Sequence, residues 1–263
     1  ILNSTGMTSV TIPNALLNFG INTFSITSVI DVNNEPAPNL PNDVQILVNP
    51  NPSATFTTTT PITCYQDDAI LEFDFIAGTP PFTVNYEINT ILAVPSLVFA
   101  GMGTQSQTLS PDPNIGTNTY SILNIIDNKG CVGYINTTED ILVNELPDLD
   151  VAILGPDPIC ATEISTLVFP IVSGLAPFNL NLLDGSNPIT LNIDAAGLIG
   201  GQPYQVSPSL TTTYTLVSVS DANGCSQNLN KNETLTVNPL PLVNITGDNE
   251  ICDEDISYIY FNF

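Results

Sequence analysis

The chain has 263 residues, with 26 acidic residues against two Lys and no His or Arg, and its formal net charge is −24. Without His and Arg it lacks the groups of a Ser-His-Asp or Cys-His nucleophile, an imidazole metal site and a bidentate phosphate clamp, so we expect no enzyme activity and no organic cofactor. The shortage of cations also excludes nucleic acid as a partner, and no apolar stretch approaches the ~20 residues needed for membrane insertion.

The composition favours a folded chain built from strands. Hydrophobic residues make up 43% of the chain and charged residues only 11%, so a core can form and the charge reflects missing cations. The 22 Pro and 16 Gly are scattered between short β-branched runs, which is typical of many strands joined by turns.

The cysteines reveal an internal repeat. Cys64, Cys160 and Cys252 form a first series, 96 and 92 positions apart (160 − 64 and 252 − 160). Cys131 and Cys225 form a second series, 94 positions apart (225 − 131). The residues around the cysteines repeat with them, so the cysteines define the register of each copy.

Residues 1–49 are predicted to be the C-terminal part of an immunoglobulin-like (Ig-like) repeat. The run INTFSITSVIDVNNE, with Phe24, resembles the runs that lead to the second-series cysteines, and Glu35 stands where the cysteine would be. A final strand VQILVNP follows it.

Residues 50–146 are predicted to be a complete Ig-like repeat. After its first-series cysteine, apolar residues recur at every second position, as on one face of a strand, at Leu71, Phe73 and Phe75. A turn from Gly78 to Phe82 leads to the next strand, because Gly and Pro set the backbone angles of a reversal. Further along come Tyr120, the Asp127–Gly130 turn and a last strand DILVNELP.

Residues 147–240 repeat this order and are predicted to be a second complete Ig-like repeat. The corresponding residues are Leu167, Phe169, Ile171, Gly174, Phe178, Tyr214 and the turn Asp221–Gly224. Residues 241–263 contain Cys252, followed by Ile259, Phe261 and Phe263, and are predicted to be the N-terminal part of a further repeat.

These strands and turns predict an all-β fold, with tandem antiparallel β-sandwiches of immunoglobulin type arranged end to end. The junctions NPNP, NELPD and NPLPL are short and contain Pro, which favours a semi-rigid connection over a flexible linker.

The regular spacing predicts two disulfides inside the complete repeats, Cys64 with Cys131 and Cys160 with Cys225. We expect each bridge at the end of its sandwich, joining an early strand to the last hairpin; free buried cysteines are the alternative. Cys252 would lack a partner because its repeat stops at Phe263. Disulfides persist outside the cytosol, so the pairing implies an extracellular protein.

Calcium is the metal that this composition could hold, because it prefers the oxygen ligands of Asp and of backbone carbonyls. Asp148 and Asp150 lie at a junction between repeats, with Asp157 nearby, and are the candidate ligands. The equivalent junction has Leu242, Val243 and Asn244, and the chain contains no EF-hand loop.

Most aromatic residues recur in each repeat and are expected in the core. Tyr258 and Tyr260 alternate with Ile259 and Phe261, which predicts that they face outward as weak candidates for contact with a ligand.

The pattern TTTYTLVSVSDANGC…TLTVNPLP, following IC…F…GLAPF, resembles the PKD-like and Ig-like repeats of very large cell-surface proteins of Bacteroidota, including gliding-motility adhesins of SprB type. The resemblance covers essentially the whole chain, through Tyr120, Asp127, Gly130 and Cys131 in one copy and Tyr214, Asp221, Gly224 and Cys225 in the next. It implies export by type IX secretion and display at the cell surface as a filament or adhesin.

The resulting hypothesis is a structural and adhesive stalk whose partners are an external surface, a polysaccharide or another cell-surface protein, together with adjacent repeats of the same chain. The alternatives are a glycan-binding module, the non-catalytic stalk of a secreted hydrolase and a self-assembling filament subunit that pairs through an edge strand.

Overall fold

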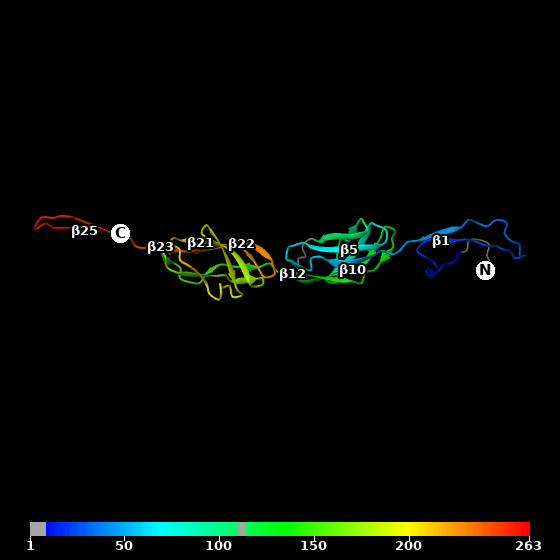
Figure 1. Ribbon diagram of the computed structural model, residues 1–263, viewed down its shortest axis with the longest axis horizontal. Coiled ribbons are helices and arrows are strands. Elements are labelled where there is room, and N and C mark those ends of the chain that lie inside the picture. The colour runs from blue at the N-terminus through cyan, green and yellow to red at the C-terminus, as the bar shows by residue number, and fades with distance from the viewer. Residues whose placement is uncertain (1–8, 110–113) are drawn as a thin grey trace. The chain divides into compact units, whose positions relative to one another are not determined.

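The computed structural model describes residues 9–109 and 114–263, and its regular secondary structure is almost entirely β-strand (Figure 1). The described part has one short 3₁₀ turn, η1 (Asn14–Leu16), and no α-helix. Contacts divide the chain into two compact units, Ile1–Val143 and Asn144–Phe263. None of the described residues belongs to a helix that is long and apolar enough to cross a membrane.

The first complete repeat is a sandwich of two antiparallel sheets. One sheet has the order β3 (Ser53–Thr58), β5 (Ala69–Ala77), β9 (Gly103–Leu109). The other has the order β4 (Ile62–Cys64), β12 (Thr138–Asn144), β10 (Gly116–Ile126), β6 (Phe82–Ile88), β7 (Ile91–Leu92), with β8 (Leu97–Phe99) on β6 and β11 (Val132–Gly133) on β10. The two-sheet arrangement agrees with the sequence prediction.

The core of this sandwich comes from alternate residues of facing strands. In β5, Leu71, Phe73 and Phe75 are all buried, while the polar residues between them are not. The ring of Phe75 stacks on that of Phe82 with centroids 4.3 Å apart. Full burial of one such side chain contributes roughly 2 kcal/mol, so the alternating pattern sets both the register and the inner face of β5.

The second complete repeat has its own sandwich. Its sheets have the orders β14 (Ala152–Ile153), β16 (Ser165–Val168), β20 (Tyr204–Val206) and β19 (Asn187–Ile193), β18 (Phe178–Asp184), β21 (Thr212–Ser220), β22 (Ser226–Leu235). Two short pairs complete it, β13 (Asp148–Leu149) with β17 (Ile171–Ser173) and β15 (Ile159–Cys160) with β23 (Val237–Asn238).

The two cores are built from corresponding residues. The first cluster of buried residues runs from Phe56 to Val143 and the second from Leu149 to Val237. Tyr120 in β10 and Tyr214 in β21 are almost fully buried, each eleven residues before a second-series cysteine (131 − 120 and 225 − 214). The boundaries predicted between residues 49 and 50, 146 and 147, and 240 and 241 lie outside both clusters and stay predictions.

The described residues of the flanking segments form antiparallel strand pairs and belong to neither buried cluster. At the beginning, β1 (Gly20–Phe24) pairs with β2 (Val44–Val48), and at the end β24 (Asn244–Gly247) pairs with β25 (Ile259–Asn262). Ile259, Phe261 and Phe263 are exposed, so the apolar face predicted for this strand is uncovered in the present chain.

Candidate functional site at the ends of the repeats

Each second-series cysteine follows a turn that is organised by one aspartate. The Asp221 carboxylate accepts hydrogen bonds from the main-chain N–H groups of Asn223 and Cys225, both at 3.0 Å. The Asp127 carboxylate accepts equivalent bonds from Lys129 and Cys131, both at 2.9 Å. Asn and Asp side chains form such turns readily, which is why the Asp-x-x-Gly sequence recurs.

The first, diverged copy has the same turn with glutamate in place of cysteine. Asp31 accepts the N–H groups of Asn33 at 2.8 Å and Glu35 at 2.9 Å. The N–H of Glu35, followed by that of Asn33, holds the pKa of the Asp31 carboxyl below its ordinary value, although desolvation opposes them. The N–H of Glu35 thus makes the same bond to the turn aspartate as the N–H groups of Cys131 and Cys225, which confirms that Glu35 occupies the position of a second-series cysteine.

The second carboxylate oxygen of each complete turn binds the end of the sandwich where the chain enters. Asp127 accepts the N–H of Thr79 and Asp221 accepts that of Leu175, both at 3.0 Å. Each of these residues follows a glycine that packs on the first residues of the repeat, since a Cβ on Gly174 would lie 2.8 Å from the Cα of Pro147. We call this the entry end, and the second-series cysteines lie there.

The first-series cysteines share a different turn. The carbonyl groups of Cys64, Cys160 and Cys252 accept the N–H of the residue three positions later, at 2.9, 3.0 and 3.1 Å. The residue two positions after each cysteine has a positive φ of 70–74°: Gln66, Thr162 and Glu254. The three cysteines are therefore presented by the same local backbone structure.

These turns lie at the end of the repeat where the chain leaves, which we call the exit end. Cys160 pairs with Asn238 in the parallel strands β15 and β23, the last pairing of its repeat. Cys64 ends β4, which neighbours β12, and Leu142 of β12 donates its N–H to the carbonyl of Pro61 at 2.9 Å. First-series and second-series cysteines thus occupy opposite ends of one repeat.

The structure corrects the predicted disulfides. Cys131 and Cys160 have free thiols, as does Cys252, whereas Cys64 and Cys225 are each disulfide-bonded. The intra-repeat pairs Cys64 with Cys131 and Cys160 with Cys225 are therefore wrong, while the presence of a disulfide is confirmed.

Strand length explains this error. Between the two cysteine positions of the first repeat lie strands of nine and eleven residues, β5 and β10. Each strand residue rises about 3.3 Å, so the ends of such strands lie roughly 25–35 Å apart. A disulfide requires Cα atoms within about 7 Å of each other. The sequence indicated this separation. Cys64 precedes the long strand β5, whereas Cys131 follows the long strand β10, which ends beside the Gly78 turn at the other end of β5.

The three predicted calcium ligands make separate contacts. Asp148 forms a salt bridge of 2.6 Å with Lys231. Asp150 accepts the N–H of Val151 at 2.9 Å, and Asp157 accepts that of Thr236 at 2.9 Å. Among the described residues, no group of three or more Asp, Glu, Cys or His side chains is arranged to hold a metal ion. The structure does not bring the predicted ligands together.

Tyr258 and Tyr260 lie on one face of the last hairpin, with ring centroids 6.3 Å apart. Both are exposed, as predicted, but Ile259 and Phe261 on the opposite face are exposed to a similar degree. Exposure therefore does not distinguish the tyrosines as a binding pair.

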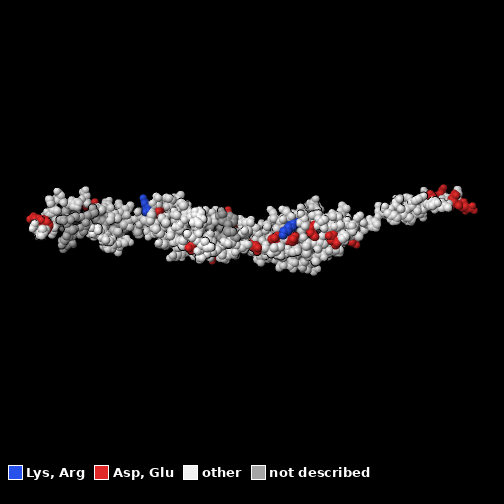
Figure 2. All heavy atoms as spheres, turned by 180° about the vertical axis from the view of Figure 1, so that it is seen from behind, with Lys and Arg blue, Asp and Glu red and all other residues white. Residues whose placement is uncertain are grey.

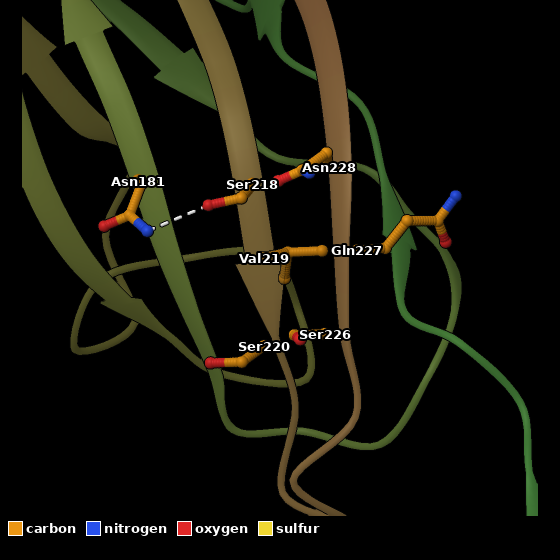
Figure 3. Close-up of a pocket in the computed structure, with 7 residues that line it drawn as sticks. All are labelled: Asn181, Ser218, Val219, Ser220, Ser226, Gln227 and Asn228. Atoms are coloured by element: carbon orange, nitrogen blue, oxygen red, sulfur yellow. Dashed lines mark hydrogen bonds between the residues drawn. The ribbon is translucent and has the colours of Figure 1, made fainter. Parts of the chain in front are cut away.

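A polar hollow of about 310 Å³ lies on the outer surface of β18, β21 and β22 (Figure 3). Asn181 points toward Ser218 and donates a hydrogen bond of 2.9 Å to its hydroxyl group. The hollow forms beside a β-bulge between Leu216 and Ser218. Its lining residues include amides and hydroxyl groups but no aromatic ring.

The remaining surface carries few charges. Figure 2 shows acidic side chains scattered over a face that consists mostly of uncharged residues. The partly exposed pair of Asp148 and Lys231 is the single salt bridge among the residues that the structure describes. This face thus shows the excess of acidic over basic side chains expected from composition.

Comparisons with solved structures return adhesins and modular domains. A calcium-stabilised adhesin that helps an Antarctic bacterium reach out and bind ice is 12% identical, with a TM-score of 0.43; the match covers 80% of this chain and 55% of that one. The Escherichia coli adhesin FdeC is 13% identical, with a TM-score of 0.44 and coverages of 80% and 73%. The FN1–FN3 domains of chicken CNTN1 are 10% identical, with a TM-score of 0.34 and coverages of 80% and 76%.

The chain thus spans little more than half the length of the ice-binding adhesin. At these identities and TM-scores the likenesses assign no function. No protein-family model and no curated protein sequence matches the chain.

Proposed function

We propose that this chain is a segment of the stalk of an extracellular bacterial surface protein, with a structural and adhesive role. The observation that carries the proposal is the recurrence of one module with its own core and its own cysteine turns. A protein that must reach away from a cell can gain length by repeating such a module, since each copy buries its own apolar residues.

The composition supports a role outside the cell. A disulfide persists in an oxidising compartment, and with only two Lys and no Arg the chain offers trypsin-like proteases two cleavage sites. Its net charge of −24 disfavours collapse of neighbouring copies onto one another through like-charge repulsion.

The finer assignment follows from the sequence pattern. The cysteine, tyrosine and Asp-x-x-Gly spacing resembles Bacteroidota surface repeats, so we propose a gliding adhesin or surface filament that is exported by type IX secretion. Its partners would be an external surface, a polysaccharide or another cell-surface protein.

Deletion of residues 50–240 from the protein in its source cell tests this role. We expect the truncated protein to be displayed normally, with an epitope at its outer end closer to the cell in immunogold electron micrographs. The control is the Asn181→Ala variant, which keeps both modules and should keep the epitope distance. An unchanged distance after the deletion would refute the stalk.

A glycan array with the intact 263-residue chain tests the glycan-binding alternative. The stalk proposal predicts no specific binding. Binding that is lost in Asn181→Ala would favour a lectin-like module, since this residue lines the polar hollow of Figure 3.

A further inference from the structure

A second surface hollow, of about 620 Å³, lies entirely within the second repeat. It is formed by the turn between β18 and β19, by β20 with the residues that follow it, and by the beginning of β21. Asp184, Tyr204 and Tyr214 line it, together with smaller polar residues, and no lysine does. We call it the second hollow.

Tyr214 gives the first indication of a ligand in the second hollow. Its side chain is fully buried, and its hydroxyl group has no hydrogen-bond partner among the described residues. Desolvation, followed by the charge of Asp184 and by Tyr204, raises the pKa of Tyr214 to about 12, so the hydroxyl lies close to both of these lining residues. A buried polar group without a partner is costly, and a ligand group that hydrogen-bonds to it removes that cost.

Asp184 sets the charge that such a ligand should carry. The side chain is half-buried, and no described residue donates a hydrogen bond or a salt bridge to its carboxylate. After desolvation, its charge is the next cause that raises the pKa of both Tyr204 and Tyr214. The electrostatic potential in the second hollow is therefore negative, which favours a cation and disfavours an anion.

The first repeat does not have these side chains at the equivalent positions. Ile88 pairs with the buried tyrosine of its repeat where Asp184 does so in the second. Gln107 takes the place of Tyr204 in the strand register. The shared fold thus requires neither side chain, and both are available for a role of the second repeat alone.

The turn beside Asp184 differs as well, and the difference leaves space. Asn89 holds the position of Gly185 in the first repeat, with φ of 52° against 58°. Its side chain donates a hydrogen bond of 2.8 Å to Asn118 and accepts the N–H of Thr119 at 2.9 Å, which fills the corner. At Gly185 this side chain is missing, and a Cβ there would have only Thr212 within 4 Å.

We propose that the second hollow binds a primary ammonium group, presented by a lysine side chain of a partner protein. The group can donate hydrogen bonds to the Asp184 carboxylate and to the hydroxyl oxygens of Tyr204 and Tyr214, and aromatic rings attract a nearby cation. The unbranched stem of lysine suits a site whose innermost polar group is buried. A calcium ion fits less well, since it takes roughly six to eight oxygen ligands and the lining offers one carboxylate.

NMR titration of the ¹⁵N-labelled 263-residue chain with acetyl-lysine amide tests the site. About 0.15 M salt is used, because it screens long-range attraction to the acidic chain. We expect saturable shifts of the N–H signals of Gly185, Ser186 and Ser207, with a dissociation constant on the order of 1 mM for a ligand of this size. Acetyl-norleucine amide, with the same number of side-chain carbons but no ammonium group, should cause none. Equal shifts with both compounds, or lysine shifts that do not saturate, would overturn the proposal.

Asp184→Asn tests the charge with little change of shape. We expect binding of acetyl-lysine amide to weaken at least tenfold, because the ammonium group loses its counter-ion. Asp194→Asn is the matched control, since Asp194 is also half-buried and lies in a turn outside the hollow. Its affinity should equal that of the wild type. An unchanged affinity in Asp184→Asn, or equal weakening in both variants, would refute the site.

Gly185→Asn tests the space without removing a polar group. The new side chain should fill the corner as Asn89 does, and we expect binding to weaken at least fivefold. Asn89 shows that asparagine adopts this backbone conformation, and a dispersed NMR spectrum checks that the variant is folded. Gly200→Asn is the control, because Gly200 has φ of 57°, open space around its Cβ position and no part in the lining. Wild-type binding in Gly185→Asn, or equal loss in the control, would contradict the placement.

A neutral sugar is the alternative ligand for a hollow lined by hydroxyl groups. Methyl glucoside in the same titration should leave the signals of Gly185 and Ser186 unchanged. Saturable binding of the glucoside without binding of the lysine compound would overturn the ammonium site and favour the glycan-binding alternative.

The ammonium site goes beyond the proposed stalk function and does not depend on it. An unchanged epitope distance after deletion of residues 50–240 would refute the stalk and leave lysine binding standing. Failure of the lysine titration would refute the site and leave the stalk standing.

Discussion

Asp221 and Cys225 hold each other through two hydrogen bonds. The Asp221 carboxylate accepts the N–H of Cys225 at 3.0 Å, and the N–H of Asp221 donates to the carbonyl of Cys225 at 3.0 Å. A third bond, from Leu175 to the same carboxylate, ties the turn to the entry end. One buried aspartate therefore positions both the disulfide-bonded cysteine and the turn that opens the next strand.

Replacement of Asp221 by Ala should destabilise the second repeat by about 3 kcal/mol. The change leaves the N–H groups of Leu175, Asn223 and Cys225 without their acceptor, and loss of a hydrogen bond to a charged group costs about 1.5–3 kcal/mol. Urea unfolding followed by tyrosine fluorescence measures the loss. Asp194→Ala is the matched control, since this half-buried aspartate accepts two N–H groups in a surface turn where the buried Asp221 accepts three, and its loss should be about 1 kcal/mol. Equal losses would contradict the role of burial.

Gly174→Ala should cost about 3 kcal/mol for two reasons. Gly174 has φ of 97°, which L residues adopt with strain of roughly 1–2 kcal/mol. The new Cβ would also lie 2.8 Å from Pro147 and 2.9 Å from Phe178. Gly224→Ala separates the two terms, because its φ is 83° and no heavy atom lies within 4 Å of its Cβ position. We expect Gly224→Ala to destabilise the repeat by about 1 kcal/mol, measured by thermal unfolding. Equal losses in the two variants would exclude a contribution from the contacts with Pro147 and Phe178.

Tyr214→Phe should leave the second repeat as stable as before or raise its stability by about 1 kcal/mol. The Tyr214 hydroxyl is buried without a hydrogen-bond partner, and an unsatisfied buried polar group costs about 1–3 kcal/mol. Tyr204 is half-buried and, like Tyr214, lines the second surface hollow of about 620 Å³, so Tyr204→Phe should change stability less. A marked loss of stability in Tyr214→Phe, measured by urea unfolding, would show that the hydroxyl has a partner.

Tyr214 also predicts how stability depends on alkaline pH. Desolvation, followed by the negative charge of Asp184 and by Tyr204, raises the pKa of Tyr214 to about 12. The folded state then holds its proton more tightly than the unfolded state, where the pKa is about 10. This contribution is complete below pH 10 and is lost as the pH rises toward 12. Absorbance at 295 nm should show late ionisation of one tyrosine, which Tyr214→Phe removes.

Calcium should leave the unfolding temperature unchanged if Asp148 stays paired with Lys231. The pair is partly exposed, with side-chain exposures of 30% for Lys231 and 34% for Asp148, so its own contribution is at most about 1 kcal/mol. Calorimetry of wild type, Asp148→Asn and Asp150→Asn, each with calcium and with chelator, measures both effects. A rise in the unfolding temperature of the wild type with calcium, abolished in either variant, would support the predicted calcium site.

Much of each sandwich could be predicted from local patterns. The alternation of Leu71, Phe73 and Phe75 is determined by the two-residue period of a strand, and the three residues are buried together. The Glu35 substitution in the first turn was also predictable, because Asp31 and the spacing survive around it, with Asn34, which also has a positive φ, in the place of the glycine. The exposure of Ile259 was not, since burial of an apolar strand face depends on which other elements pack against it, and none of the described elements covers this one.

The cysteine pairing shows where local patterns stop. The sequence by itself determined that the chain repeats, where its strands and turns fall, and that Cys64 and Cys160 are equivalent, because periodicity and turn chemistry act over a few residues. Only the tertiary structure decided that the two cysteine series lie at opposite ends of each repeat, so that the bonds predicted inside one repeat do not form. That outcome depends on the direction in which long strands cross the sandwich, and a spacing of about 66 residues along the chain does not reveal it.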